Sequence, residues 1–550
     1  MRVRSCGLLT PVCLFSVIAC GEDPVATSET TSASTTAETT AATTAETTTA
    51  APTTTAEPPT TSDTPTTAAS TGEAPEPPAI ARGIRLTRVT ATQGVQTEIV
   101  RDGLELPPED YAVALISRRK TVLRADWSLH ASFVPRELLA RLTLYTPEGE
   151  THVDEYKALV EGPSNDGDFT RTFRWQLPAE LVRPGMEYRI EAFEADPEAA
   201  SGEVSDPPPI LPLAGRGKLV VEDNPMVIKV ELIPVKHVFD GMTCMPTITD
   251  DDVLDMQKWM EQHNAVERAE LTVAEPMEYT ESIGTAEEGF VPVLTALGIH
   301  RAKVKPAANV YWYGLLQSCD AYPIGLLGQA YGIPEAPTVG LAFQRIATGR
   351  YLGSGADARD TFVHEVGHSQ GRYHIRCSGG EAGTDPDYPH PNGRIGVWGY
   401  GIHDTQLRSP TGYRDYMTYC DNSFVSDYGW DLTYGFIKEL SSWDMAGAPA
   451  EDAPLLVGTL HSDGSATWWT TRGSAPQRGR SSDTRVEFAI AGETITLPAS
   501  VGEIPDSSAQ VVAAPLPPRW AEVDALRLVV AGQLRHASPR AAVRELHAAP

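Results

Sequence analysis

The sequence predicts a multidomain chain in which a mixed α+β (α/β) domain is flanked by an N-terminal β-sandwich and a small C-terminal β-domain. With 550 residues, the chain is too long for one ordinary domain. Short runs rich in β-branched and aromatic residues, separated by Pro, Gly and Asp clusters, occupy residues 83–225 and return in residues 449–550. Between them, strand-like alternation and helical periodicity are mixed, which is typical of an α+β or α/β domain.

The N-terminus carries the features of an export signal. Arg2 and Arg4 precede an apolar stretch of about 14 residues, which is too short to span a bilayer. This stretch ends in Val-Ile-Ala-Cys, which resembles the lipobox of bacterial lipoproteins. The resemblance implies that Cys20 is lipidated and becomes the mature N-terminus, and Gly21 after it favours the outer membrane or the cell surface. The alternative is an ordinary secretory signal with a chance cysteine.

A segment of biased composition follows the signal. From Pro24 to Ala79 the chain consists almost entirely of Thr, Ala, Glu, Pro and Ser and contains no aromatic residue. Such a segment cannot offset the entropy of its own ordering, so we expect a flexible tether that reaches roughly 40 Å. The predicted segments are a lipoprotein signal peptide, a tether, a β-sandwich, a mixed domain and a C-terminal β-domain, at residues 1–19, 20–82, 83–225, 226–448 and 449–550.

The net charge excludes one class of partner. It is −29 at pH 7, whereas a protein that neutralises nucleic-acid phosphates needs a basic face. We therefore expect no nucleic-acid partner. Neither β-rich flank contains a motif that carries chemistry, and the N-terminal one is expected to be a spacer or a docking domain.

The central domain contains both kinds of regular element. Asp250 opens an acidic run before an apolar-periodic stretch, which indicates the start of a helix more than a calcium site. Residues 308–316 and 338–346 are predicted to be buried strands. From Ala358 the pattern predicts a helix that ends at Gly371.

The strongest functional signal is the run HEVGHSQGRYH at residues 364–374. His364 and His368 are four residues apart, so on a helix both imidazoles project from one face and can share one ion. Gly371 permits the left-handed backbone that ends a helix, after which the chain turns back and brings His374 to the same ion.

These residue types suit hydrolysis by an activated water molecule. Three neutral imidazoles with one open position are what a catalytic zinc ion requires. The ion lowers the pKa of the water and polarises a carbonyl group, while Glu365, next to the first histidine, takes the proton. The sequence therefore predicts one catalytic Zn²⁺ held by His364, His368 and His374, with Glu365 as the general base.

The extended motif is similar to the signature of the metzincin metallopeptidases, and the downstream run RDYMTYC supports the resemblance. Metzincins place a methionine in a tight turn beneath the zinc, a role that Met417 fits; the alternative is a core methionine. In astacin-like and serralysin-like members a tyrosine two positions later assists the transition state, which Tyr419 matches. The resemblance implies a metzincin-like fold for the central domain. Ile375, after the third histidine, leaves the exact family unassigned, and no motif supports a calcium site.

The resemblance also bears on the cysteines. Of seven cysteines, three belong to the signal and the lipobox, and the other four allow three pairings of two disulfides. In metzincins the methionine turn lies beneath the zinc, so Cys377, just after His374, is expected beside Cys420, just after Met417. This implies the pairs Cys377–Cys420 and Cys244–Cys319.

Weaker candidates lie around the motif. His390 and His403 follow the zinc helix and are expected to be surface or structural residues, with a second metal as the alternative. Residues 338–343 occupy the place where metzincins have an edge strand that pairs with an extended substrate, although a plain core strand fits equally.

The sequence thus predicts an exported, lipid-anchored zinc endopeptidase that hydrolyses peptide bonds in extracytoplasmic proteins or glycoproteins. Its partners would be that substrate and, through the N-terminal lipid, a membrane. The alternative is a surface binding or adhesion module that retains a metzincin fold with structural zinc. A surface structural protein would explain the tether but not the histidine motif.

Overall fold

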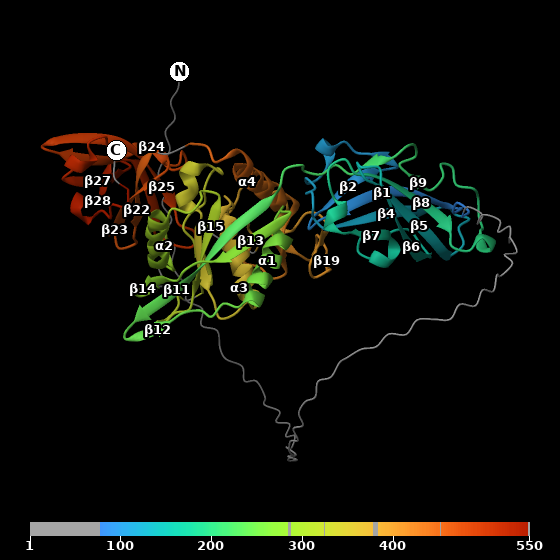
Figure 1. Ribbon diagram of the computed structural model, residues 1–550, viewed down its shortest axis with the longest axis horizontal. Helices are drawn as coiled ribbons and strands as arrows, with labels where there is room; N and C mark the ends of the chain where they lie inside the picture. Colours follow the sequence, from blue (N-terminus) through green and yellow to red (C-terminus); the bar gives the residue numbers. More distant parts are fainter. Residues whose placement is uncertain (1–77, 284–287, 324, 378–382, 451–452, 548–550) are drawn as a thin grey trace, which may run out of the picture. The chain divides into compact units, whose positions relative to one another are not determined.

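The computed structural model describes residues 78–547 except 284–287, 324, 378–382 and 451–452. The predicted signal peptide, the predicted lipidation site at Cys20 and the tether up to residue 77 lie outside the described residues. The described chain is multidomain and β-rich, with several sheets and few helices (Figure 1), which confirms the predicted predominance of β-structure. No helix among the described residues is long and apolar enough to cross a membrane.

The N-terminal region consists of two five-stranded antiparallel sheets that share one core. Their orders are β3-β2-β1-β4-β7 and β10-β8-β5-β6, with β9 paired to β8. Trp127 and Trp175 of the first sheet and Leu142 and Ile190 of the second belong to the same buried cluster. The strands are β1 Ile84–Thr92, β2 Gln96–Arg101, β3 Leu104–Glu105, β4 Thr121–Leu129, β5 Arg136–Tyr145, β6 Thr151–Val160, β7 Phe173–Leu177, β8 Glu187–Glu194, β9 Ile210–Leu211 and β10 Gly217–Lys218.

The central region is built on a seven-stranded, largely parallel sheet. Its order is β12-β11-β15-β17-β16, and β13 and β14 pair with β11 as well. The short strands β12 and β16 run antiparallel to their neighbours, and β16 forms one edge of the sheet. The strands are β11 Val227–Phe239, β12 Met242–Cys244, β13 Arg268–Val273, β14 Met277–Tyr279, β15 Val310–Leu316, β16 Gly328–Ala330 and β17 Ile346–Arg350.

Different elements cover the two faces of this sheet. On β15, Tyr311 and Tyr313 belong to one core cluster with residues of α1, α3 and α4, whereas Trp312 belongs to another with residues of α2. Such alternation is what a strand produces, because successive side chains point to opposite faces. The helices are α1 Asp250–His263, α2 Val291–Val304, α3 Ala356–Ser369 and α4 Asp427–Ala446.

One predicted helix start is confirmed and one predicted strand is wrong. The acidic run opens α1, and Asp252 closes a capping box with the preceding threonine. The segment Val339–Gln344, however, is a 3₁₀ helix, and the strand begins only at Ile346. A Cβ atom on Gly340 would collide with the side chain of Ser474, so this segment packs closely on the C-terminal region. Its apolar residues are buried by that contact, which a short apolar run does not distinguish from sheet pairing.

The C-terminal region is a seven-stranded antiparallel sheet of order β23-β22-β26-β25-β24-β27-β28. Leu456 belongs to its own core, whereas its neighbours Leu455 and Val457 belong to the cluster that contains Leu294 of α2. The sheet is therefore fixed to the central region by a shared apolar core. The strands are β22 Pro454–Leu460, β23 Ala466–Arg472, β24 Arg480–Ile490, β25 Glu493–Glu503, β26 Gln510–Pro515, β27 Ala525–Val530 and β28 Gln533–Pro539.

Both predicted disulfides are present. Cys244 of β12 is bonded to Cys319, which follows β15, with Cα atoms 5.4 Å apart. Cys377 is bonded to Cys420 with Cα atoms 6.3 Å apart, and this bond joins two segments that are 43 residues apart in the chain. Both bonds lie in the central region. Cys244–Cys319 lies at the ends of two strands, and Cys377–Cys420 lies next to the histidine run.

Candidate metal site

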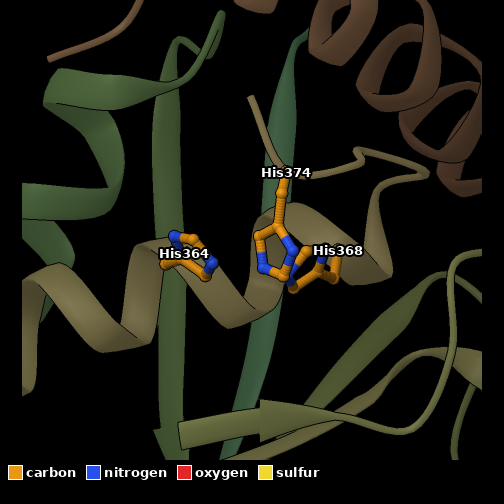
Figure 2. Close-up of side chains that lie close together, drawn as sticks. All are labelled: His364, His368 and His374. Atoms are coloured by element: carbon orange, nitrogen blue, oxygen red, sulfur yellow. The ribbon is translucent and has the colours of Figure 1, made fainter. Parts of the chain in front are cut away.

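Three histidines converge where α3 ends. His364 and His368 lie one turn apart on α3, and His374 reaches the same point from the loop that follows the helix (Figure 2). One ring nitrogen from each lies within 4.8 Å of one from each of the others, and all three side chains are buried. This group could hold a metal ion, as the sequence predicts for these three residues. Among the described residues, no other set of His, Cys, Asp or Glu side chains forms such a group.

Gly371 allows the chain to return to the helix. Its φ is +84°, in the left-handed region, as predicted for the end of the helix. A Cβ atom there would lie 2.8 Å from the carbonyl oxygen of Pro334 and 2.8 Å from Cζ of Phe436. Both the backbone conformation and the lack of space therefore require glycine, and this turn brings His374 over the helix.

Backbone carbonyls fix two of the imidazole rings. Nδ1 of His364 lies 2.8 Å from the carbonyl oxygen of Tyr416, and Nδ1 of His368 lies 2.7 Å from that of Arg372. Because a carbonyl oxygen can only accept a hydrogen bond, each Nδ1 must donate it. The neutral rings then present an unprotonated Nε2 to the site, which is the form that binds a metal ion.

Met417 lies directly beneath α3. It is fully buried, and a Cβ atom on Gly367 would lie 2.6 Å from its sulfur atom, so the helix and the methionine are in close contact. The turn is held by Asp415, which accepts a hydrogen bond from the backbone N–H of Met417 at 2.9 Å. The same carboxylate forms a 2.9 Å ion pair with Arg372, and both side chains are almost completely buried. The methionine turn is thus tied to the loop that carries His374.

Burial determines the protonation of the site. It lowers the pKa of His364 to about 4, with a contribution from His374, and it lowers that of His368 still more clearly. Burial also raises the pKa of Glu365, and the neighbouring Asp506 adds to this effect. Near neutral pH His364 and His368 are therefore neutral, as metal binding requires.

Two buried polar atoms fit a metal ion and a water molecule. Within the described part of the chain, Nε2 of His364 and Oε2 of Glu365 have no hydrogen-bond partner. A buried polar atom without a partner is costly, and an ion at Nε2 and a water molecule at Oε2 would satisfy these two atoms. The donor set of three imidazoles with a carboxylate beside it is the one that zinc favours.

Tyr419 lies at the open side of the triad. Its hydroxyl group is 2.8 Å from Nε2 of His374, and its ring is stacked near that of His364 with centroids 5.7 Å apart. The side chain is 55% exposed, unlike the buried histidines. The structure therefore brings Tyr419 to the site together with the three histidines and Glu365.

Asp506 is a residue of the site that sequence reasoning missed. It belongs to the loop between β25 and β26 of the C-terminal region. One carboxylate oxygen accepts a hydrogen bond from the Tyr419 hydroxyl at 2.5 Å, and the other lies 3.6 Å from Nε2 of His374. Its local sequence, Pro-Asp-Ser-Ser, indicates only a turn and gives no sign of a contact with His374 or with Tyr419, which is 87 positions away.

Two cavities flank the triad. One of about 620 Å³ lies between the central and C-terminal regions and is lined by Tyr373 and His374 among others. The other, of about 710 Å³, is lined by Glu365 and Tyr419 among others. Asp506 alone lines both cavities among the described residues. The Asp506 carboxylate therefore lies next to the triad, at the boundary between the two cavities.

The other candidate residues have structural roles. Nε2 of His390 lies 2.6 Å from the carboxylate of Asp427, and Nε2 of His403 lies 2.8 Å from that of Glu261. Neither histidine joins the triad. Asp252, from the acidic run, caps α1 and belongs to no group that could hold a metal among the described residues.

Comparison with known proteins adds no further information. No family model matches the chain, and no curated protein matches it. The functional argument therefore depends on the geometry of the histidine triad and the residues around it.

Proposed function

We propose that the chain is a zinc-dependent endopeptidase of the metzincin type, which hydrolyses peptide bonds in extracytoplasmic proteins. The observation that carries the proposal is the convergence of three buried imidazoles beside Glu365, whose buried Oε2 atom has no hydrogen-bond partner within the described chain. A structural metal site needs its ligands but does not require a buried carboxylate beside them. A hydrolase needs that carboxylate as its base.

Each residue of the site has a chemical role in this proposal. His364, His368 and His374 would hold the ion, which when bound polarises the scissile carbonyl group and acidifies a water molecule. Glu365 would take the proton from that water and return it to the leaving amine, and its raised pKa suits a group that accepts a proton near neutral pH. Tyr419 would donate a hydrogen bond to the developing oxyanion.

The sheet edge offers a place for an extended peptide. Strand β16 is an edge strand, and Gly328 within it lies against Glu365: a Cβ atom there would be 2.8 Å from Cγ of the glutamate. A peptide added to this edge would pass beside the general base and would be recognised mainly through its backbone. The proposed substrate is therefore an extended segment of a protein or glycoprotein.

A binding module with a structural metal is the second candidate. One observation favours it: a carboxylate oxygen of Asp506 lies 3.6 Å from Nε2 of His374, where it would hinder the approach of a substrate to the ion. In that case the protein would bind a partner through its β-rich regions.

Two variants test the proposed activity. Glu365→Gln keeps the side-chain size but removes the base, so zinc content should stay near one per chain while peptide cleavage falls about 10²-fold or more. His368→Ala removes a ligand, so it should lose the metal as well as the cleavage. Undiminished cleavage of protein substrates by Glu365→Gln would overturn the mechanism.

We further propose that the protein is exported and anchored through a lipid on Cys20, at the outer membrane or the cell surface of a bacterium. The two disulfides support an oxidising compartment, because such bonds are rare in cytosolic proteins. The lipobox-like sequence before Cys20 supports the anchor.

A further inference from the structure

We propose that the cavity of about 620 Å³ beside His374 is a substrate subsite that selects a tyrosine side chain next to the scissile bond. This inference rests on the proposed function, because it names the class of substrate that the same metal site would cleave. One wall of the subsite belongs to the C-terminal region, so that region would take part in the choice of substrate.

The cavity adjoins the candidate metal site. His374 lines it, and this imidazole belongs to the triad that would hold the ion. Asp506 lines it as well, and its carboxylate accepts a hydrogen bond from Tyr419 at 2.5 Å. A peptide whose scissile carbonyl group lies at the ion would therefore place a neighbouring side chain at this cavity. Its volume lies in the range of ligand-binding sites, so a large side chain fits.

Apolar side chains from two regions form the walls of the cavity. Phe343 comes from the 3₁₀ helix of the central region, whereas Ile504, Val511 and Ala513 come from β26 and the loop before it. All four are buried in the core shared with α2. Ligand sites are typically lined in this way, with few polar groups that fix the orientation of the ligand. The walls therefore favour a large apolar or aromatic side chain.

Gln344 supplies a polar group without a partner. It lines the cavity and is only 4% exposed, and its Oε1 atom has no hydrogen-bond partner within the described chain. A buried oxygen of this kind is costly, and a donor on a bound ligand would satisfy it. Tyrosine combines an apolar ring with a hydroxyl group that usually finds a partner when buried. The cavity therefore fits tyrosine better than phenylalanine, which has no donor.

Contacts between the two regions hold the mouth of the cavity. The carboxylate of Glu335, in the central region, accepts hydrogen bonds at 2.6 Å from the backbone N–H groups of Gln477 and Arg478, in the C-terminal region. The guanidinium of Arg478 lies over the ring of Tyr373, 5.1 Å from its centroid. The subsite is thus formed before a substrate arrives, which lowers the cost of binding.

Charge disfavours two other classes of side chain. The described lining residues include three carboxylates, those of Glu335, Glu503 and Asp506, but only one guanidinium, that of Arg478. An acidic side chain would therefore be repelled. Glu503 and Asp506 are exposed, and Glu335 is already bonded to backbone N–H groups. A lysine or arginine head between the buried walls would lose its water without gaining a buried partner.

The test compares the full-length, zinc-loaded chain with its Gln344→Leu variant. Gln510→Leu is the matched control, because it makes the same change on β26 outside the cavity lining. The probes are N-acetyltyrosinamide and N-acetylphenylalaninamide, which differ only in the hydroxyl group. Their Kd values are measured by ligand-observed NMR in the Glu365→Gln background, where cleavage plays no part. Cleavage sites in a denatured proteome are profiled separately with Glu365 intact.

The unaltered cavity should bind the tyrosine probe at least about five-fold more tightly than the phenylalanine probe, because only the former satisfies Oε1 of Gln344. Gln344→Leu should abolish or reverse this preference, and Gln510→Leu should keep it. Cleavage sites of the unaltered chain should be enriched in tyrosine over phenylalanine at one position beside the scissile bond, and Gln344→Leu should lose this enrichment. Urea unfolding should show no loss of stability in Gln344→Leu, since the variant removes an unpaired polar group.

Equal affinity of the unaltered cavity for the two probes, or a preference that survives Gln344→Leu, would overturn the subsite. An equal loss of cleavage at all sequences in Gln344→Leu would assign the amide to the substrate backbone and contradict the selection of tyrosine. Because probe binding is measured without cleavage, a tyrosine preference that depends on Gln344 in a chain that cleaves nothing would confirm the subsite and contradict only the peptidase.

Discussion

The two β-rich flanks meet the central region in different ways. The N-terminal region joins it through Val95, Val113 and Ile116, which belong to the central core, and through backbone hydrogen bonds. The N–H of Tyr400 donates to the carbonyl oxygen of Gly94 at 2.8 Å, and that of Gln96 donates to the carbonyl oxygen of Trp398 at 2.9 Å. No described residue of the N-terminal region lines either cavity beside the triad. The C-terminal region shares an apolar core with α2 and places Asp506 at the triad.

The N-terminal region therefore supports the central region from outside the candidate site, whereas the C-terminal region contributes a residue to that site. Gly94 approaches Trp430 so closely that a Cβ atom would lie 2.6 Å from its ring, which indicates a fixed junction on the N-terminal side. Changes at that junction should therefore alter stability and leave the metal site intact. A change at Asp506, in the loop of the C-terminal region, should alter the site more than stability.

The largest expected effect on stability lies at the N-terminal junction. The buried guanidinium of Arg119 donates to the carbonyl oxygens of Gln93 at 2.7 Å, Val266 at 2.5 Å and Glu261 at 2.6 Å. Arg119→Met leaves these acceptors without a donor and should cost about 3 kcal/mol or more of unfolding free energy. Urea unfolding measures this cost. The exposed neighbour Arg118, which pairs with Glu267, is the control.

Arg118→Met should cost at most about 1 kcal/mol, since exposed ion pairs contribute little. Neither variant should change zinc affinity. A ten-fold change in zinc affinity in Arg119→Met would show that the N-terminal region also affects the candidate metal site, and would contradict the difference drawn between the two flanks.

Acid should destabilise the metal-free chain through the triad. His364 has a pKa of about 4 in the folded chain and about 6.5 when unfolded, so the unfolded state binds the proton first as the pH falls. The stability from this histidine is present above about pH 6.5 and is lost as the pH falls towards 4. The loss is about 3 kcal/mol.

Urea unfolding of chelator-treated protein at pH 7 and at pH 4.5 measures this loss. His364→Asn should show a smaller dependence on pH, because it removes the titrating group. Equal pH dependence in the two chains would contradict the assignment of the effect to His364.

Tyr419→Phe tests the residue that joins the triad to the C-terminal region. Loss of one oxyanion donor should lower kcat ten- to a thousand-fold, with KM and zinc content nearly unchanged. The same change removes the hydrogen bond to Asp506. An unchanged kcat would mean that the tyrosine only packs against the histidine rings.

The smallest effect on the site is expected from the N-terminal anchor. Cys20→Ala should release the protein from the membrane fraction while cleavage by the soluble form stays unchanged. Detergent partitioning and the mass of the mature N-terminus measure this. A mature chain that begins at an unmodified residue other than Cys20 would refute the lipid anchor.

The sequence predicted the elements whose formation depends on residues close together in the chain. The i, i+4 spacing of His364 and His368 and the glycine at 371 predicted the helix and its turn, because helical period and left-handed backbone are local properties. The metzincin resemblance gave the disulfide pairing, which Cys377–Cys420 confirms.

The features that the sequence did not predict share one physical cause. The 3₁₀ helix at Val339–Gln344 was predicted as a strand, and Asp506 was not recognised, because both depend on contacts with a region distant in sequence. Gln329 is a similar case, since its side chain holds the loop of Asp506 from the edge strand. When a segment is buried by a distant part of the chain, its own sequence shows no periodic pattern that identifies this contact.

Cleavage of a broad peptide library by zinc-loaded protein tests the central claim most directly, with the unaltered chain and Glu365→Gln assayed side by side. The account predicts cleavage by the unaltered chain that a chelator abolishes and added zinc restores, and cleavage by Glu365→Gln that is slower by about 10²-fold or more. If both forms carry one zinc per chain and cleave nothing in the library, the protein is not an endopeptidase and the binding module becomes the better account.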